Sequence, residues 1–130
     1  MKILLATKNI AKVDEMNTLL SELPVEFVWI GSIIEELPKV IEDGVTYHDN
    51  AMKKAMTFYN LSLMPTLAED SGLEVLLLNG APGICSARFA GEGATDKENI
   101  QKLLQMLKGV PFEKREAKFV SVLCFVLDGK

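Results

Sequence analysis

The pattern of apolar and polar residues changes along the first thirty positions, and each change predicts an element. Residues 2–6 (KILLA) are a short apolar run, typical of a buried strand. Residues 7–23 then have apolar side chains at helical spacing, namely Ile10, Val13, Met16, Leu20 and Leu23. Pro24 is expected to stop this helix. Residues 25–30 (VEFVWI) are rich in β-branched and aromatic side chains and predict a second strand.

Two further helices are indicated by their start signals. Thr46 with Asp49 matches a helix N-cap, and the helix that follows has an apolar face made by Ala51, Ala55, Phe58 and Tyr59. Thr95 with Glu98 matches a capping box, and its helix has a core stripe made by Ile100, Leu103, Leu104 and Leu107. Gly109 and Pro111 are expected to close that second helix.

The remaining segments predict strands and one long loop. Residues 66–80 indicate a strand, a tight turn at Ser71 and Gly72, and another strand. Residues 80–96 are glycine-rich and predict a functional loop with at most one helical turn, and residues 117–129 predict a long strand. This order predicts an α/β fold with a mixed β-sheet flanked by helices, in a single domain over residues 1–130.

Composition narrows the possible partners and compartment. The net charge of −4 argues against a non-specific nucleic-acid binder, because such proteins carry a basic surface. Two cysteines without a CxxC pattern and a single histidine argue against a zinc site or a disulfide framework. No apolar run reaches the roughly 18 residues of a membrane span, and the apolar part of MKILLAT is too short for a signal peptide. We therefore expect a cytoplasmic protein with no membrane or nucleic-acid partner.

Residues 6–12 (ATKNIAK) join the first strand to the first helix. A helix N-terminus presents free backbone N–H groups and partial positive charge, which suit phosphate. Thr7 and Asn9 add neutral donors, and Lys8 and Lys12 add positive charge. On local grounds alone, a simple helix cap with solvated lysines is the favoured interpretation.

Two carboxylate segments follow. Glu42 lies in a loop before a helix and could bind a hard cation, or could be a surface acid near a turn. Lys53 and Lys54, on the helix, most often form a solvated face. Asp70 follows an apolar strand and could hold Mg²⁺ or orient a water, while Gly72 would allow close approach of a ligand. The alternative is that the residues from Glu69 to Gly72 simply form a polar turn.

Arg88 belongs to the glycine-rich segment. Its guanidinium could clamp a phosphate or a carboxylate, or form a structural ion pair.

Four segments, taken in order, are more specific than any one of them. The chain has ATKNIAKVDE at 6–15, EDGVTYHDNAMKKA at 42–55, AEDSGL at 68–73 and GAPGICSARF at 80–89. In order and spacing these strongly resemble the motifs of the inosine/xanthosine triphosphate pyrophosphatase family, also called non-canonical purine nucleoside triphosphatases. Members of that family have an elongated two-lobed α/β fold and are usually homodimers.

The resemblance implies an activity and a set of site residues. Members hydrolyse ITP, dITP and XTP to the monophosphate and pyrophosphate with Mg²⁺, which keeps deaminated purines out of nucleic acid. Asp70 would be the general base and, with Glu42, a metal ligand. Ser71 would contact substrate, and Glu69, Lys54 and Arg88 are further candidates. The triphosphate would bind to Thr7, Lys8, Asn9, Ile10, Ala11 and Lys12.

The chain also departs from the family pattern. Members usually run to about 190 to 200 residues, and the later G-F-G-Y-D-P, Lys and S-H-R motifs have no counterpart here. We therefore expect a chain that lacks the C-terminal part, with an incomplete second lobe and an exposed sheet edge that favours a homodimer. Two hypotheses follow: a Mg²⁺-dependent pyrophosphatase, or a module that binds nucleotide or phosphate, or only dimerises, without catalysis. A related pyrophosphatase of the septum-inhibitor type is a third, to which ATKN and AEDSGL fit less well.

Overall fold

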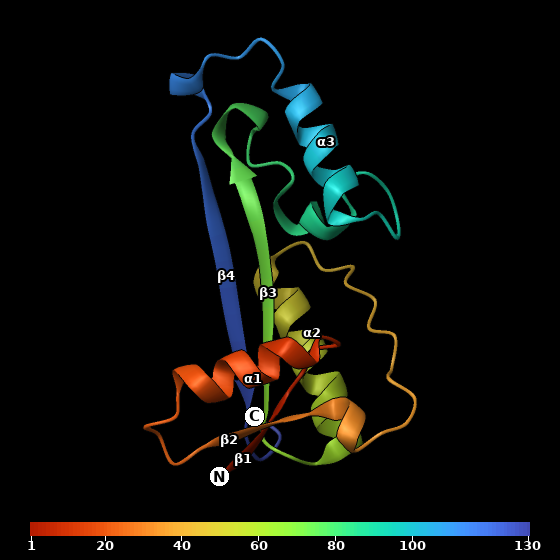
Figure 1. The fold of residues 1–130 in the computed structure, drawn as a ribbon. Coiled ribbons are helices and arrows are strands. Elements are labelled where there is room, and N and C mark those ends of the chain that lie inside the picture. Colours follow the sequence, from red (N-terminus) through yellow and green to blue (C-terminus); the bar gives the residue numbers. More distant parts are fainter. The chain divides into compact units, whose positions relative to one another are not determined.

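The computed structural model describes residues 1–130 and has the predicted α/β organisation (Figure 1). The strands are β1 (Lys2–Leu5), β2 (Glu26–Trp29), β3 (Thr66–Val75) and β4 (Ala117–Val126). The helices are α1 (Ile10–Leu19), α2 (Tyr47–Ser62) and α3 (Asp96–Met106). Short 3₁₀ segments cover Ile30–Ser32, Leu76–Leu78, Gly83–Arg88 and Phe112–Lys114. None of the helices is long and apolar enough to span a membrane.

The four strands form one sheet in the order β2-β1-β3-β4. Strand β1 is parallel to both of its neighbours, with Leu5 opposite Trp29 of β2 and opposite Leu67 of β3. Strand β4 lies beside β3 and runs in the opposite direction (Figure 1). The predicted mixed sheet is therefore confirmed.

The chain forms two compact units. One comprises Met1–Glu69 with Val122–Lys130, and the other comprises Asp70–Ser121. Strands β3 and β4 each contribute residues to both units. Whether the chain behaves as the single domain predicted from its length stays a prediction.

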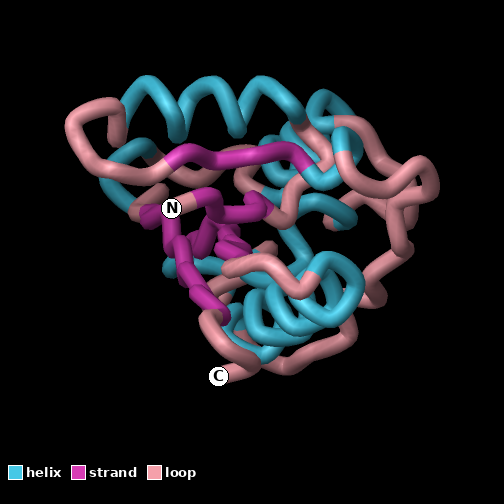
Figure 2. The backbone as a smooth tube through the Cα atoms, turned by 90° about the horizontal axis from the view of Figure 1, so that it is seen from below, coloured by secondary structure: helices cyan, strands magenta, loops and turns pink.

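In the first unit, helices cover both faces of the sheet because β1 is apolar on both sides. Leu4 and Ala6 belong to a core cluster with three residues of α2, which are Ala51, Ala55 and Phe58. Ile3 and Leu5 belong to a separate cluster that includes Phe27 of β2 and Val13 of α1. Successive strand residues face opposite sides, so α1 and α2 cover opposite faces of β1. Figure 2 accordingly shows helical segments on both sides of the strands.

The turn predicted at Ser71 and Gly72 is wrong, because both residues lie inside the continuous strand β3. A Cβ atom at Gly72 would lie 2.1 Å from the carbonyl oxygen of Gly83. Glycine is needed at this position for close packing of protein backbone rather than for a turn.

The predicted helix faces are correct for α2 and partly wrong for α1 and α3. Ala51, Ala55 and Phe58 of α2 are buried. In contrast, four residues assigned to apolar stripes are exposed, which are Ile10, Leu23, Ile100 and Leu104. The spacing of apolar residues therefore predicted a wider buried face for α1 and α3 than these helices have in the structure. In α3 the buried position is the polar Asn99, whose side chain caps nearby backbone at Ala87 and Ala90.

Candidate functional site

A site is expected at the carboxyl end of β1, beside the first residues of β3. The chain leaves β1 through α1 to reach β2 on one side, and later returns through α2 to β3 on the other side. In open α/β sheets, ligands bind where the strand order reverses in this way, outside the carboxyl ends of the parallel strands. Residues 7–12 follow the end of β1, and Glu69 lies two residues beyond the paired Leu67. The sheet therefore brings two of the predicted segments to one edge.

The start of α1 has the features expected of an anion site. Asn9 is the N-cap, and its Oδ1 accepts a hydrogen bond of 3.0 Å from the backbone N–H of Ala11. The backbone N–H of Asn9 donates to Thr7 Oγ1 at 3.1 Å. The first turn contains no acidic residue and does contain Lys12, so the helix start keeps its positive potential. Because the side-chain oxygen of Asn9 caps the helix, the Nδ2 group is the part of this side chain that could donate a hydrogen bond to an anion.

Lys12 connects this helix start to β3. Its Nζ lies 3.4 Å from Glu69 Oε2, and both side chains are partly exposed. A pair of this length and exposure contributes little stability by itself. Its significance is positional, because it places the first turn of α1 next to the residue that precedes Asp70.

Lys54 makes a second connection to the same part of β3. Its Nζ lies 2.6 Å from Glu42 Oε1 and donates to the Glu69 carbonyl oxygen at 3.0 Å. The Lys54 side chain is only 20% exposed, so the interpretation of Lys54 as part of a solvated face is wrong. One ammonium group thus links the predicted metal ligand Glu42 to the backbone that leads into Asp70.

The neighbouring lysine shows what a surface pair looks like on the same helix. Lys53 Nζ also lies 2.6 Å from a carboxylate oxygen, that of Asp43, but these side chains are 44% and 66% exposed. The hydrogen bond from Lys53, followed by its positive charge, lowers the pKa of Asp43. The predicted solvated face is therefore correct for Lys53.

Asn50 was not predicted to have a role, yet it holds the loop that carries Glu42. Asn50 is fully buried in α2, and its Oδ1 accepts a hydrogen bond of 2.8 Å from the backbone N–H of Gly44. A Cβ atom at Gly44 would lie 2.6 Å from that oxygen, so glycine is required there. The signal in the sequence is an amide residue directly beside Ala51 on the buried face of the helix.

Asp70 and its neighbours occupy different environments along β3. Asp70 is buried and 8% exposed, Glu69 is half-buried, and Ser71 is exposed. Strand alternation directs the Glu69 and Ser71 side chains to one face and the Asp70 side chain to the other. No group of three or more histidine, cysteine, aspartate or glutamate side chains is arranged to hold a metal ion.

In the second unit, the serine of the SARF motif has a structural role. Ser86 Oγ accepts a hydrogen bond of 2.9 Å from the backbone N–H of Leu73 and donates to the Gly83 carbonyl oxygen at 2.6 Å. Arg88 Nε lies 4.0 Å from Glu92 Oε1, and Nη2 lies 3.8 Å from Cys85 Sγ. The ion pair with Glu92 corresponds to the structural alternative for Arg88.

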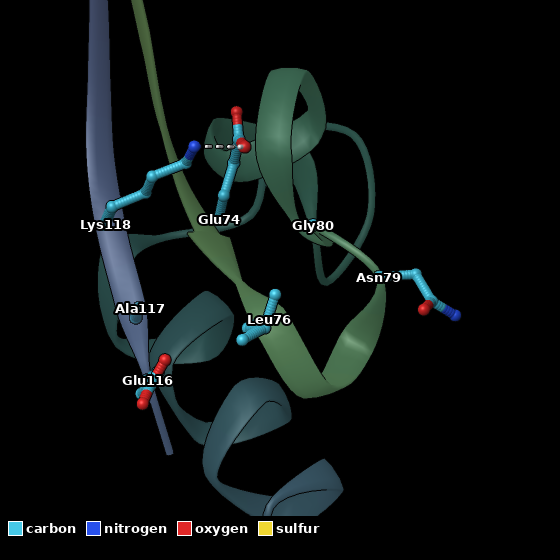
Figure 3. Close-up of a pocket in the computed structure, with 7 residues that line it drawn as sticks. All are labelled: Glu74, Leu76, Asn79, Gly80, Glu116, Ala117 and Lys118. Carbon is cyan, nitrogen blue, oxygen red and sulfur yellow. Dashed lines mark ion pairs between the residues drawn. The ribbon is translucent and has the colours of Figure 1, made fainter. Parts of the chain in front are cut away.

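The second unit also contains a pocket of about 450 Å³ between the ends of β3 and β4 (Figure 3). Figure 3 shows Lys118 and Glu74 directed toward one another across it, with Nζ and Oε1 3.9 Å apart. The other lining residues are Leu76, Asn79, Gly80, Glu116 and Ala117. No residue predicted for the site lines this pocket.

The fold is that of an α/β protein in which a positively charged helix start and carboxylates lie near the carboxyl end of a parallel strand, a combination suited to a metal-bound anionic ligand. The chain belongs to the Ham1 family, whose model matches residues 3–130. It is 42% identical over 125 residues to a dITP/XTP pyrophosphatase of Escherichia coli (strain K12), covering 96% of this chain and 62% of the relative. It is 47% identical over 122 residues to a dITP/XTP pyrophosphatase of Vibrio cholerae, covering 94% and 60%. The chain therefore spans about three fifths of the length of the curated relatives that it matches.

Solved structures agree with this assignment. A HAM1 protein from Coxiella burnetii matches with a TM-score of 0.84 and 38% identity, covering 96% of this chain and 62% of that one. A nucleoside-triphosphatase / dITP/XTP pyrophosphatase from Mycobacterium abscessus matches with a TM-score of 0.79 and 38% identity, covering 97% and 65%. The expected family resemblance is confirmed.

Proposed function

We propose that this protein hydrolyses non-canonical purine nucleoside triphosphates, ITP, dITP and XTP, to the monophosphate and pyrophosphate. The names of the matched relatives support this substrate class. The observation that carries the proposal is the 3.4 Å contact between Lys12 and Glu69, because it brings a phosphate-suited helix start to the segment that contains Asp70.

The segment Thr7–Lys12 would bind the triphosphate. The partial positive charge at the start of α1 and the ammonium groups of Lys8 and Lys12 would provide the positive potential that a polyanion needs. Lys12 would exchange part of its interaction with Glu69 for a phosphate oxygen, which is a small loss because the pair is partly exposed. Ser71, exposed on β3, would contribute a hydroxyl contact.

Mg²⁺ is the proposed cofactor, and Glu42 and Asp70 are its proposed ligands. Their carboxylate oxygens suit this ion, because Mg²⁺ typically binds one or two protein carboxylates together with substrate phosphates and water. When bound, Mg²⁺ neutralises charge between carboxylates and phosphates and stabilises the pyrophosphate leaving group. Lys54 would keep the Glu42 carboxylate in place beside β3, as its 2.6 Å contact indicates.

Asp70 would act as the general base. Its carboxylate would accept a proton from a water whose oxygen forms a bond to the α-phosphorus, while the bond from that phosphorus to the bridging oxygen breaks and pyrophosphate leaves. Burial of Asp70 favours this role, because a packed side chain has a defined position and a general base must be positioned within hydrogen-bond reach of the water. Glu69, on the other face of β3, would orient Lys12 rather than take the proton.

We also propose a cytoplasmic homodimer. Strand β4 is an edge of the sheet, and the side chains of its Leu123 and Phe125 and of Leu127 directly after it are exposed. Edge strands with exposed apolar side chains favour pairing with another chain.

The proposal is tested by incubating the protein with ITP and Mg²⁺ and measuring pyrophosphate. The Asp70→Asn variant is expected to lose roughly a thousandfold in rate, the usual contribution of a general base, while it still binds triphosphate. Triphosphate binding without turnover in the wild-type protein would instead favour the non-catalytic binding module. ITP hydrolysis unaffected by Asp70→Asn would exclude Asp70 as the base.

A further inference from the structure

Trp29, the single tryptophan of the chain, makes a contact that the proposed function does not use. It is the last residue of β2 and lies opposite Leu5 of β1. Its indole Nε1–H donates a hydrogen bond of 3.1 Å to the carbonyl oxygen of Thr7. The side chain of one strand thereby holds the backbone of the segment that leaves the adjacent strand.

The orientation of the Trp29 ring is fixed by the chain around it. A Cβ atom at Gly31 would lie 2.2 Å from the ring atom Cη2, so the absence of a side chain at Gly31 makes room for the indole. The half-buried ring also packs against both apolar clusters of the first unit. A ring packed in this way has few alternative rotamers, and its N–H is directed at the Thr7 carbonyl oxygen.

Apart from the pair between Lys12 and Glu69 and the bonds of helix α1, the contacts of the segment that receives this hydrogen bond are local. The backbone N–H of Thr7 bonds to the Leu5 carbonyl oxygen at 2.9 Å, and Thr7 Oγ1 accepts from the Asn9 N–H. Lys8, Asn9, Ile10, Ala11 and Lys12 are all exposed. Trp29 is thus a contact from outside the segment that fixes its first peptide group.

We propose that Trp29 is a positioning residue that pre-orders Thr7–Lys12 for triphosphate. The inference rests on the proposed function, since it takes this segment to be the phosphate site. A loop already held in its binding conformation avoids the entropy loss of ordering when the anion arrives, so the indole hydrogen bond contributes to affinity without touching the ligand.

Trp29→Phe separates this role from core packing. Phenylalanine keeps an apolar ring between the two clusters but has no N–H to donate. The dissociation constant for inorganic triphosphate with Mg²⁺ is expected to rise roughly three- to tenfold, the factor that corresponds to one hydrogen bond. The kcat for ITP should change much less than KM, because the contact acts on binding.

Two other variants complete the test: one is a control that keeps the indole contact, and the other disturbs the indole without changing Trp29. Ser32→Ala removes the 2.6 Å hydrogen bond from Ser32 Oγ to the Trp29 carbonyl oxygen but leaves the indole contact, so triphosphate affinity should not change. Gly31→Ala should displace the ring and weaken triphosphate binding as Trp29→Phe does. In the wild-type protein, tryptophan emission should change saturably as triphosphate is added.

The deciding measurement needs no ligand. Hydrogen exchange of the backbone amides in residues 7–12 should be faster in Trp29→Phe than in Ser32→Ala, with exchange in β1 and β3 unchanged. Wild-type exchange and wild-type triphosphate affinity in Trp29→Phe would overturn the inference and leave the proposed hydrolysis intact. Conversely, a wild-type protein that binds triphosphate without hydrolysing ITP would overturn the proposed activity alone. Absence of triphosphate binding would overturn both.

Discussion

Helices α1 and α3 both begin with a residue whose side chain caps a backbone N–H group, but their first turns carry opposite charges. Thr95 of α3 accepts a hydrogen bond from the Glu98 N–H, and Glu98 Oε2 accepts one of 2.7 Å from the Thr95 N–H. The first turn also contains Asp96, so α3 balances its own dipole with acidic residues. Helix α1 has Lys12 at the position that Glu98 occupies in α3, and its first turn has no acid.

The contrast distinguishes a helix start that serves the fold from one available to a ligand. In α3 the capping box satisfies the N–H groups of Thr95 and Glu98, and acidic residues balance the dipole, which leaves little attraction for an external anion. In α1 one orphan N–H group is capped by Asn9, and positive potential remains. A cap alone does not identify a phosphate site; the charge three residues after the cap separates the two cases.

The largest expected effect comes from exchanging that charge. Lys12→Glu gives α1 the acid that α3 has, and it also places a second carboxylate beside Glu69. Triphosphate affinity should fall roughly a hundredfold, since an attraction becomes a repulsion close to the phosphates. The free energy of unfolding should change much less, and calorimetric titration with inorganic triphosphate measures the difference.

The reverse exchange, Glu98→Lys, is the matched control. It breaks the capping box of α3 and should cost about 1 kcal/mol of stability, with no effect on triphosphate affinity. Equal losses of affinity in the two variants would mean that net charge, rather than the start of α1, controls binding.

A smaller effect is expected from substituting the two lysines of α2, whose ion pairs have the same length but different exposure. Lys54→Met leaves the half-buried Glu42 carboxylate without its ammonium partner and should cost about 1–2 kcal/mol, between the values for surface and buried pairs. It should also raise, by several-fold, the Mg²⁺ concentration needed for half-maximal activity. Lys53→Met removes an exposed pair of the same length and should change both quantities little. Urea unfolding and a Mg²⁺ titration would record the difference.

Thr95→Ala is expected to have an effect on stability alone. It removes the side-chain acceptor for the Glu98 N–H and should lower the free energy of unfolding by about 1 kcal/mol. Triphosphate affinity should stay at the wild-type value. A change in affinity would contradict the assignment of the α3 start to the fold.

The smallest effect concerns pH and Asp43. The hydrogen bond and charge of Lys53 lower the Asp43 pKa in the folded state, so this contribution to stability is present above the unfolded-state pKa and is lost as pH falls through the lowered value. Wild-type protein should therefore lose slightly more stability than Asp43→Asn between about pH 5 and pH 3. Because Asp43 is exposed, the difference should be close to the error of a urea midpoint, and a large difference would contradict a surface pair.

Local signals predicted most elements of the fold. Caps at Thr46 and Thr95 marked the starts of α2 and α3, and the apolar run of residues 2–6 marked β1. The turn predicted at Ser71 and Gly72 is wrong because polar and glycine residues usually indicate a turn, whereas here Gly83 and Ser86 pack against the strand from a segment more than ten residues away. Exposure of Ile100 and Leu104 likewise depends on what covers α3, which its own periodicity does not contain.

For the candidate site, too, the sequence predicted the local features but not the contacts between distant segments. The motifs directed attention to Thr7–Lys12, Glu42 and Asp70, because residue type and position after a strand are local properties. The contacts that organise those residues join distant segments, namely Lys54 with Glu42 and Glu69, Asn50 with Gly44, and Trp29 with Thr7. Such contacts depend on the strand order β2-β1-β3, which no local signal specifies.

If a second copy of the chain covers the sheet edge at β4, as proposed, protein concentration becomes a thermodynamic variable. Leu123, Phe125 and Leu127 present apolar surface to solvent, and a second copy that covered them would bind the folded form but not the unfolded one. Mass action would then raise the apparent melting temperature as concentration increases. Variants of this protein should therefore be compared at one fixed concentration, and a melting temperature that rises across a dilution series would itself report self-association.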